Sequence, residues 1–183
     1  MNRIILLAVV ALSTLFGNCQ KEKAKNNSDN YGNGPRTNVP ASLQGNWMYG
    51  NFSMTEYWSQ DPAGYLGNAF QMAIAFKFNA NGTYEQYFTS STVSGTVVSY
   101  QQSVTKGTVE VDESAQTIIT HANTAHYKKT QNGQTLEERD LEKSELTITS
   151  RYTYGSGTEN NGSKAIFLKL NGTGNALTFL QKF

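Results

Sequence analysis

The chain has 183 residues, with 15 Lys and Arg against 14 Asp and Glu, a formal net charge of +1 and a single cysteine. This length indicates one domain with appendages, the balanced charge argues against a nucleic-acid-binding surface, and the lone cysteine excludes an intramolecular disulfide. Charged residues make up only 16% of the chain, and the abundance of Gly, Thr, Ser, Asn and Tyr favours strands and tight turns over long helices.

Residues 1–18 carry the parts of a secretory signal. Residues 1–3 supply a positive charge, residues 4–16 form an apolar run, and two small residues precede Cys19. The run is about 13 residues long, which is shorter than the roughly 20 that a membrane-spanning helix needs. A removable export signal is therefore expected. Residues 20–23, Gln-Lys-Glu-Lys, argue against the alternative, a buried N-terminal helix.

Residues 15–19, Leu-Phe-Gly-Asn-Cys, resemble the lipobox of bacterial lipoproteins, and the charged residues that follow resemble the start of Bacteroidetes-type lipoproteins. The resemblance implies that Cys19 receives a diacylglycerol and becomes the first residue of the mature chain. Two or more acyl chains hold a protein stably on a membrane. The resemblance also implies an outer-membrane location in the cell envelope, with the domain facing the periplasm or the outside. Ordinary signal-peptide removal is the alternative.

Residues 19–40 are expected to form a flexible tether. Most of this stretch is rich in Lys, Asn, Ser and Gly, it holds two of the three prolines, and Tyr31 and Val39 are its only large apolar side chains. Such a segment buries too little surface to offset its ordering entropy. The folded domain is therefore predicted to span residues 41–183.

The domain shows the period-two pattern of strands. The clearest case has large apolar side chains at alternate positions: Phe70, Met72, Ile74, Phe76 and Phe78. Further strands are predicted at 45–52, 84–88, 96–106, 107–111, 117–128, 135–142, 146–154, 166–170 and 177–183. Asn-Gly pairs at 81–82, 132–133, 161–162 and 171–172 suit tight hairpin turns. Residues 54–68 break the pattern and are expected to form an elaborated loop or a short helix.

This order of elements predicts eight or nine consecutive antiparallel strands, each with one apolar face. Closing the sheet into an up-and-down β-barrel of about eight strands covers those faces and removes the sheet edges. We therefore expect an all-β fold with such a barrel, and a β-sandwich is the alternative.

Two short motifs carry a family resemblance. Residues 43–47, Leu-Gln-Gly-Asn-Trp, and residues 78–84, Phe-Asn-Ala-Asn-Gly-Thr-Tyr, resemble lipocalin-like domains of bacterial lipoproteins. The resemblance implies a lipocalin-like barrel in which Trp47 plugs the closed end and Gly45 is a turn residue. Both roles are structural.

No constellation of catalytic or metal-ligating residues stands out. His121 and His126 are five residues apart, so on a regular strand they would point to opposite faces and would not share a metal. The acidic stretch 137–142 has the mixed charges of a solvated strand or loop, and residues 112–113 suit a turn. We expect no enzyme activity, no metal and no cofactor.

Aromatic side chains are the remaining clue to function. Five of them are predicted to point into the barrel: Phe76, Tyr84, Phe88, Tyr100 and Tyr152. They would either fill the interior or leave a cavity that takes a ligand, with Trp58 in the loop as part of a lid. The leading hypothesis is a membrane-anchored lipoprotein whose barrel binds a small apolar or amphipathic ligand. The alternative is a structural or accessory subunit that docks on an envelope protein complex through the outer barrel surface or the 54–68 loop.

Overall fold

The structure, a computed structural model, describes residues 29–59 and 70–182. The predicted export signal and Cys19 therefore lie outside the described residues. The strands are β1 (Gly45–Tyr49), β2 (Phe70–Phe78), β3 (Thr83–Ser94), β4 (Val97–Asp112), β5 (Thr117–Gln131), β6 (Gln134–Asp140), β7 (Thr149–Thr158), β8 (Lys164–Leu170) and β9 (Leu177–Lys182). The described residues also include three short 3-10 helices: η1 (Asp29–Tyr31), η2 (Tyr57–Ser59) and η4 (Lys143–Glu145). Within the described ranges, no helix has the length and apolar character needed to cross a bilayer.

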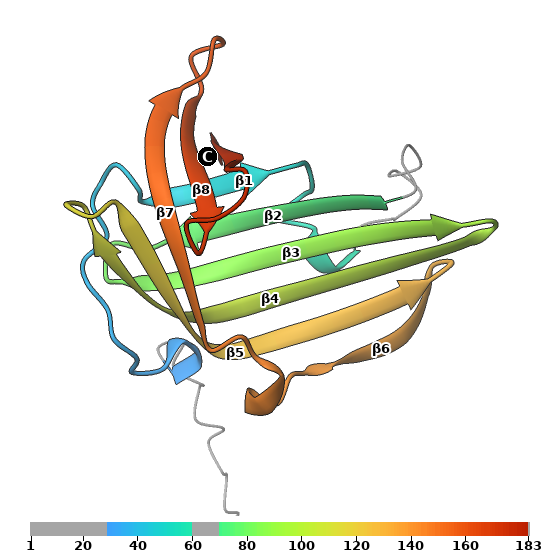
Figure 1. The fold of residues 1–183 in the computed structure, drawn as a ribbon. Helices are drawn as coiled ribbons and strands as arrows, with labels where there is room; N and C mark the ends of the chain where they lie inside the picture. The colour runs from blue at the N-terminus through green and yellow to red at the C-terminus, as the bar shows by residue number, and fades with distance from the viewer. Residues whose placement is uncertain (1–28, 60–69, 183) are drawn as a thin grey trace, which may run out of the picture.

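The strands form one antiparallel sheet that closes on itself (Figure 1). Eight strands make the ring, in the order β1-β2-β3-β4-β5-β7-β8-β9, and β9 pairs again with β1. Strand β6 lies outside the ring and pairs with β5. The prediction of an all-β antiparallel barrel of about eight strands is therefore confirmed.

The Asn-Gly pairs lie in turns between consecutive strands, as predicted. Asn132 and Gly133 have φ angles of 48° and 80°, and Asn171 and Gly172 have 51° and 66°. Positive φ at two successive residues suits the twist of tightly joined antiparallel strands.

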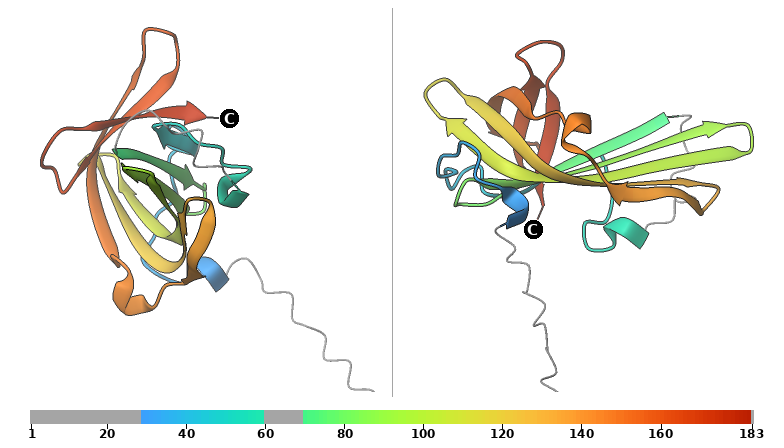
Figure 2. Two further views of the ribbon diagram at one scale, coloured as in Figure 1. Left: turned by 90° about the vertical axis from the view of Figure 1, so that its right-hand side faces the viewer. Right: turned by 90° about the horizontal axis from the view of Figure 1, so that it is seen from below.

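The eight strands encircle the interior at only one end of the barrel, and the sheet is open at the other end. Strand β5 pairs with β7 over residues 117–121 and with β6 over residues 126–131. The long strands β2 to β5, together with β6, therefore extend past β7, β8 and β9 (Figure 2). At this open end the inner face of the sheet is not covered by the second half of the ring.

A β-bulge marks the change of partner on β5. Lys106 pairs with Thr124 and Gly107 pairs with Ala122, so Asn123 is the extra residue. Position 107 requires glycine, because a Cβ there would overlap the backbone oxygen of His121. The bulge turns the following side chains of β5 to the other face.

Aromatic and aliphatic side chains fill the interior of the closed ring, which we call the ring interior. Its buried members on the strands are Trp47, Phe76, Phe78, Tyr84, Val109, Ile118, Ile166, Leu168 and Phe179. Trp47 is 1% exposed, and its indole nitrogen donates a hydrogen bond to the Leu43 carbonyl at 2.7 Å. Gly45, at the start of β1, has a φ of +104°.

A second, smaller core lies on the outer face of the sheet. Phe52 and Tyr57, from the segment after β1, pack there with Ala73, Ala75 and Val104. The Tyr57 hydroxyl donates to the carbonyls of β3 and β4, including the Ser103 oxygen at 2.9 Å. Residues 50–59 therefore cover part of the outer face of the barrel.

Residues 29–40, which we call the N-terminal strap, pack along the barrel. Thr37 donates its backbone N–H to the Val109 carbonyl at 3.1 Å, and Val39 donates to Ala80 at 3.1 Å. The Val39 side chain is buried in the core. The prediction of a flexible tether is wrong for residues 29–40, because strand-like backbone pairing and burial of Val39 offset their ordering entropy. Residues 19–28 of the predicted tether lie outside the described residues.

Candidate functional site

The ring interior is occupied by side chains that pack against one another. The Phe76 ring centroid lies 5.4 Å from Phe78, 5.6 Å from Phe179 and 5.7 Å from Tyr152. Tyr84 is 1% exposed, and burial raises the pKa of its hydroxyl. Three of the predicted ligand-binding residues, Phe76, Tyr84 and Tyr152, therefore contribute to this core.

The other two predicted inward residues lie elsewhere. Phe88 is on the inner face at the open end, in register with Ile74, and is half-buried. Tyr100 is buried on the outer face, so the prediction that it points inward is wrong. The register explains this: Tyr84 pairs with Gly107, which makes the odd-numbered residues of β4 face inward.

Trp58 is not a lid over the mouth of the barrel. It follows Tyr57 in η2 on the outer face, and its ring centroid lies 4.8 Å from that of Tyr57 and 4.9 Å from that of His126. Both contacts are edge-to-face. Trp58 thus belongs to the outer core.

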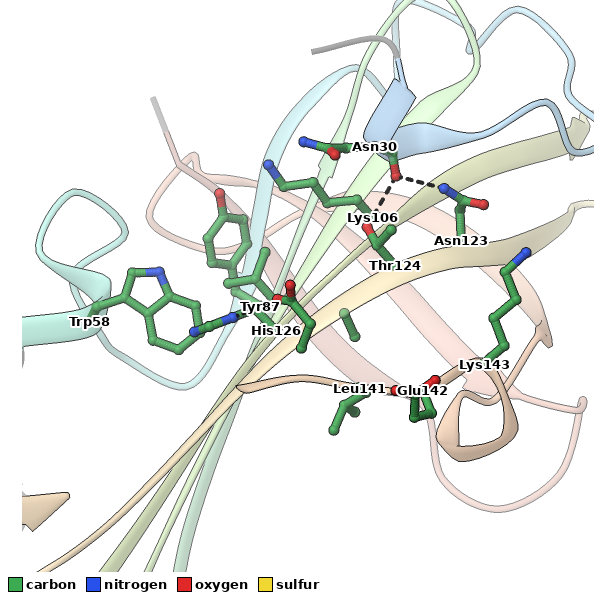
Figure 3. A pocket seen from close by; sticks show the side chains of 13 residues that line it. Asn30, Trp58, Tyr87, Lys106, Asn123, Thr124, His126, Leu141, Glu142 and Lys143 are labelled. Carbon is green, nitrogen blue, oxygen red and sulfur yellow. Dashed lines mark hydrogen bonds and ion pairs between the residues drawn. The ribbon is translucent and has the colours of Figure 1, made fainter. Parts of the chain in front are cut away.

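A cavity of about 570 Å³, which we call the outer pocket, lies beside Trp58 on the outer face (Figure 3). Its lining comes from η1, η2, the strands β3 to β6 and the segment after β6: Asn30, Trp58, Tyr87, Val104, Lys106, Asn123, Thr124, Ala125, His126, Asp140, Leu141, Glu142 and Lys143. This volume lies in the range of small-molecule sites in proteins.

The β-bulge holds the N-terminal strap at one wall of the outer pocket. The Asn123 amide donates to the Asn30 carbonyl at 3.0 Å, and the Thr124 hydroxyl donates to the same oxygen at 3.1 Å (Figure 3). Because the extra residue at 123 directs these groups toward η1, the irregularity in β5 positions the strap.

A buried carboxylate fixes the adjacent wall. Glu85 is 6% exposed and accepts hydrogen bonds from the hydroxyls of Tyr31 and Tyr87, each at 2.5 Å. The Lys77 ammonium lies 3.6 Å from it. Burial raises the pKa of the Glu85 carboxyl, but the hydrogen bonds from the two tyrosines and the nearby lysines outweigh it, so the pKa lies below its ordinary value. Tyr87 is thereby held in place beside the outer pocket.

His126 connects the pocket to the edge strand β6. Its Nδ1 lies 2.8 Å from an Asp140 carboxylate oxygen, and its Nε2 lies 3.6 Å from Glu138. The Lys128 ammonium lies 3.5 Å from Glu138 and donates to the Trp58 carbonyl at 3.4 Å. These contacts join β5, β6 and η2 around one side of the pocket.

The prediction that His121 and His126 point to opposite faces is wrong. His121 pairs with Thr108 and His126 pairs with Val104, and both of these β4 residues face outward. The two histidines therefore share the outer face, because the extra residue Asn123 lies between them on β5. The two imidazoles still serve different sites, since His121 contacts Glu110 at 2.7 Å. No group of three or more metal-ligating side chains occurs among the described residues.

Sequence reasoning missed the polar half of this site. Lys106, Asn123 and His126 gain their position from a bulge that leaves no clear signal in the strand pattern. Asn30 falls in a stretch whose composition is typical of linkers. Among the lining residues only Trp58 was predicted to bind a ligand, and in a different place; His126 and the acidic stretch 137–142 were noted without a binding role.

Comparison with known proteins gives no further assignment. No family model, no curated protein and no solved structure matches the chain.

Proposed function

We propose that the protein is a lipid-anchored binding module of the cell envelope, without enzyme activity, that takes a small amphipathic ligand in the outer pocket. One observation carries the proposal: a cavity of about 570 Å³ lies on the outer face, whereas aromatic rings fill the ring interior. These observations favour a ligand site beside Trp58 over one among the inward-facing rings.

Native mass spectrometry of the protein purified from its own cells tests this placement. Thr124 is exposed and lines the pocket, so Thr124→Trp fills the cavity without removing a core side chain. We expect this variant to lose a co-purifying small molecule that the unmodified protein retains. Thr158→Trp, at an exposed position of β7, is the matched control and should retain it.

A third variant distinguishes the pocket from the open end of the barrel. Gln101 pairs with Ser90 on the inner face beyond the closed ring. A ligand that is lost from Gln101→Trp but kept by Thr124→Trp would place it in the mouth of the barrel and would refute the outer pocket.

The lipid anchor rests on the apolar run and on residues 15–19. Two acyl chains would keep the domain at a membrane without a membrane-binding surface of its own. Metabolic labelling with a fatty acid should mark the unmodified protein and not Cys19→Ser. Equal labelling of both would exclude lipidation at this cysteine.

Docking on an envelope complex is the second candidate function, and the uncovered inner face at the open end favours it. Met72, Phe88 and Tyr127 are half-buried on this face, which β7, β8 and β9 do not reach (Figure 1). A photo-crosslinker at position 101 in intact cells should capture one reproducible partner if docking is the function, and a crosslinker at exposed Thr158 should not.

A further inference from the structure

We infer that the outer pocket selects an anionic amphiphile, a molecule whose apolar body contacts Trp58 and Val104 and whose carboxylate, sulfonate or phosphate lies beside Lys106 or Lys143. The inference rests on the proposed function and names the class of its ligand. It follows from which groups of the pocket already have partners and which do not.

Apolar surface lines the inner part of the pocket. Val104 is 7% exposed, and Trp58, Tyr87 and Leu141 are half-buried around it. An apolar body placed here would remove water from surfaces that the fold leaves partly uncovered.

Most neutral polar groups of the pocket are already used by the fold. The side-chain donors of Asn123 and Thr124 bond to the Asn30 carbonyl, and the Tyr87 hydroxyl bonds to Glu85. They position the strap and the wall, so a ligand would have to replace these bonds to use the same donors.

The two lysines differ from these groups. Among the described residues no carboxylate oxygen lies within 4.0 Å of the Lys106 or Lys143 ammonium nitrogen. Lys106 lies over the Tyr31 ring, with its nitrogen 5.8 Å from the ring centroid, and it contributes to the lowered pKa of Glu85 from beyond ion-pair distance. Lys143 is exposed at the other side of the pocket (Figure 3).

The charged groups of the pocket differ in how far water reaches them. Asp140 contacts His126 at 2.8 Å, and its side chain is 89% exposed. Glu142 and Lys143 are exposed as well, whereas Lys106 is half-buried. Because exposed charges are screened more strongly than partly buried ones, an anion gains most beside Lys106, and removal of Glu142 should strengthen its binding.

Two fluorescent probes with the same aromatic body test the charge preference. 8-Anilinonaphthalene-1-sulfonate is an anion, and N-phenyl-1-naphthylamine is its counterpart without the sulfonate. We expect the sulfonate probe to bind the purified protein at least about tenfold more tightly at low salt, which corresponds to about 1.4 kcal/mol. Added salt should narrow the difference, because it screens charges near the surface.

Charge variants locate the preference. Lys106→Gln should remove most of the tenfold difference, Lys106→Arg should retain it, and Glu142→Gln should widen it. Lys129→Gln, on the inner face of the extended sheet, is the matched control and should leave the difference unchanged. Far-ultraviolet circular dichroism checks that each variant is folded.

The outcomes separate this inference from the proposed function. Equal binding of both probes, abolished by Thr124→Trp, overturns the anion preference and leaves the pocket as a binding site. Binding that survives Thr124→Trp, or no binding of either probe, contradicts the pocket itself. A sulfonate preference that persists after Lys106 and Lys143 are both replaced by Gln overturns the assignment to these lysines.

Competition identifies the source of the anionic amphiphile. Dodecanoate below its micellar concentration should displace the sulfonate probe if the pocket takes a free molecule. Displacement by phosphatidylglycerol vesicles and not by dodecanoate would assign the same chemistry to a membrane lipid, and displacement by neither would contradict the ligand class.

Discussion

The two faces of the sheet formed by β1 to β4 use their apolar side chains differently. On the inner face, Phe76 of β2 contacts Tyr152 of β7 across the barrel, with ring centroids 5.7 Å apart. On the outer face, the small side chains of Ala73 and Ala75 lie under the segment that carries Tyr57, and a pocket remains beside it. The comparison indicates that the side chains of a closed barrel of this size fill its interior. Space for a ligand arises on the outer face, where short side chains and a bulge interrupt the packing.

The largest effect is expected from truncating an aromatic side chain in the packed ring interior, compared with one at the open end of the same face. Phe76→Ala should lower the free energy of unfolding by about 4 kcal/mol, because it opens a cavity in the closed ring. Phe88→Ala, at the open end, should cost about 1 kcal/mol, because its side chain is only partly buried. Chemical denaturation measures both values. Equal costs would show that the two ends are equally well packed.

Gly107 links the two faces, since it lies at the bulge. Gly107→Ala should cost about 3 kcal/mol, because the new methyl group would overlap the His121 backbone oxygen and lie 2.9 Å from the Tyr84 ring. Gly155→Ala is the control: the nearest side-chain atom there lies 3.7 Å away, so the change should be within about 0.5 kcal/mol. A stable Gly107→Ala protein would mean that the bulge can shift freely.

The attachment of the N-terminal strap to the outer face should depend on acid. The pKa of Glu85 is lowered from 4.5 in the folded protein, so its stabilising contribution is present above about pH 4.5 and is lost as the pH falls below it. Tyr31→Phe removes one hydrogen bond to this carboxylate and should cost about 1 to 2 kcal/mol at pH 7.

Unfolding measured between pH 7 and pH 3 checks the sign. The loss of stability on acidification should be smaller in Tyr31→Phe than in the unmodified protein. Tyr49→Phe, an inward-facing control without a carboxylate partner in the described structure, should follow the unmodified curve. A larger acid loss in Tyr31→Phe would contradict the assigned role of Glu85.

The smallest effect is expected at the edge strand β6, where Arg139 is exposed. Arg139 contacts Glu145 through two hydrogen bonds of 2.7 Å, and this contact, with a backbone N–H from Glu142, lowers the pKa of the Glu145 carboxyl to about 2. Arg139→Gln should return that pKa toward 4.5, measured by NMR titration. Because both side chains are exposed, the unfolding midpoint should barely change, and a large drop would mean that β6 stabilises the barrel.

The sequence predicted the fold class well because its signals are local and repeated. Alternation along residues 70–78 and the Asn-Gly turns each depend on a few neighbouring residues. Closure of the ring then follows from the need to cover apolar faces. The facing of Tyr100 was wrong because it depends on how β3 and β4 align, which the pattern of β4 alone does not determine.

The candidate site was mostly beyond reach for a related reason. Its residues come from η1, from the segment around Trp58, from a bulge and from the chain after β6, so no single stretch shows them together. Asn123 shifts the phase of β5 by one residue, and this changed the predicted relation between His121 and His126. The strap was missed because composition reports average polarity, whereas Val39 and Tyr31 supply two specific contacts.

The docking of the N-terminal strap also limits how far the barrel can lie from Cys19. The backbone carbonyl of Asn30 is bonded to β5, and eleven residue steps separate Asn30 from Cys19, which span at most about 40 Å. If Cys19 carried lipid, the barrel would lie close to the bilayer. Asn30 and the outer pocket would then be on the side of the barrel from which the chain runs toward Cys19. Molecules partitioned into that bilayer would then meet the pocket at a high effective concentration, so modest intrinsic affinity would suffice for occupancy.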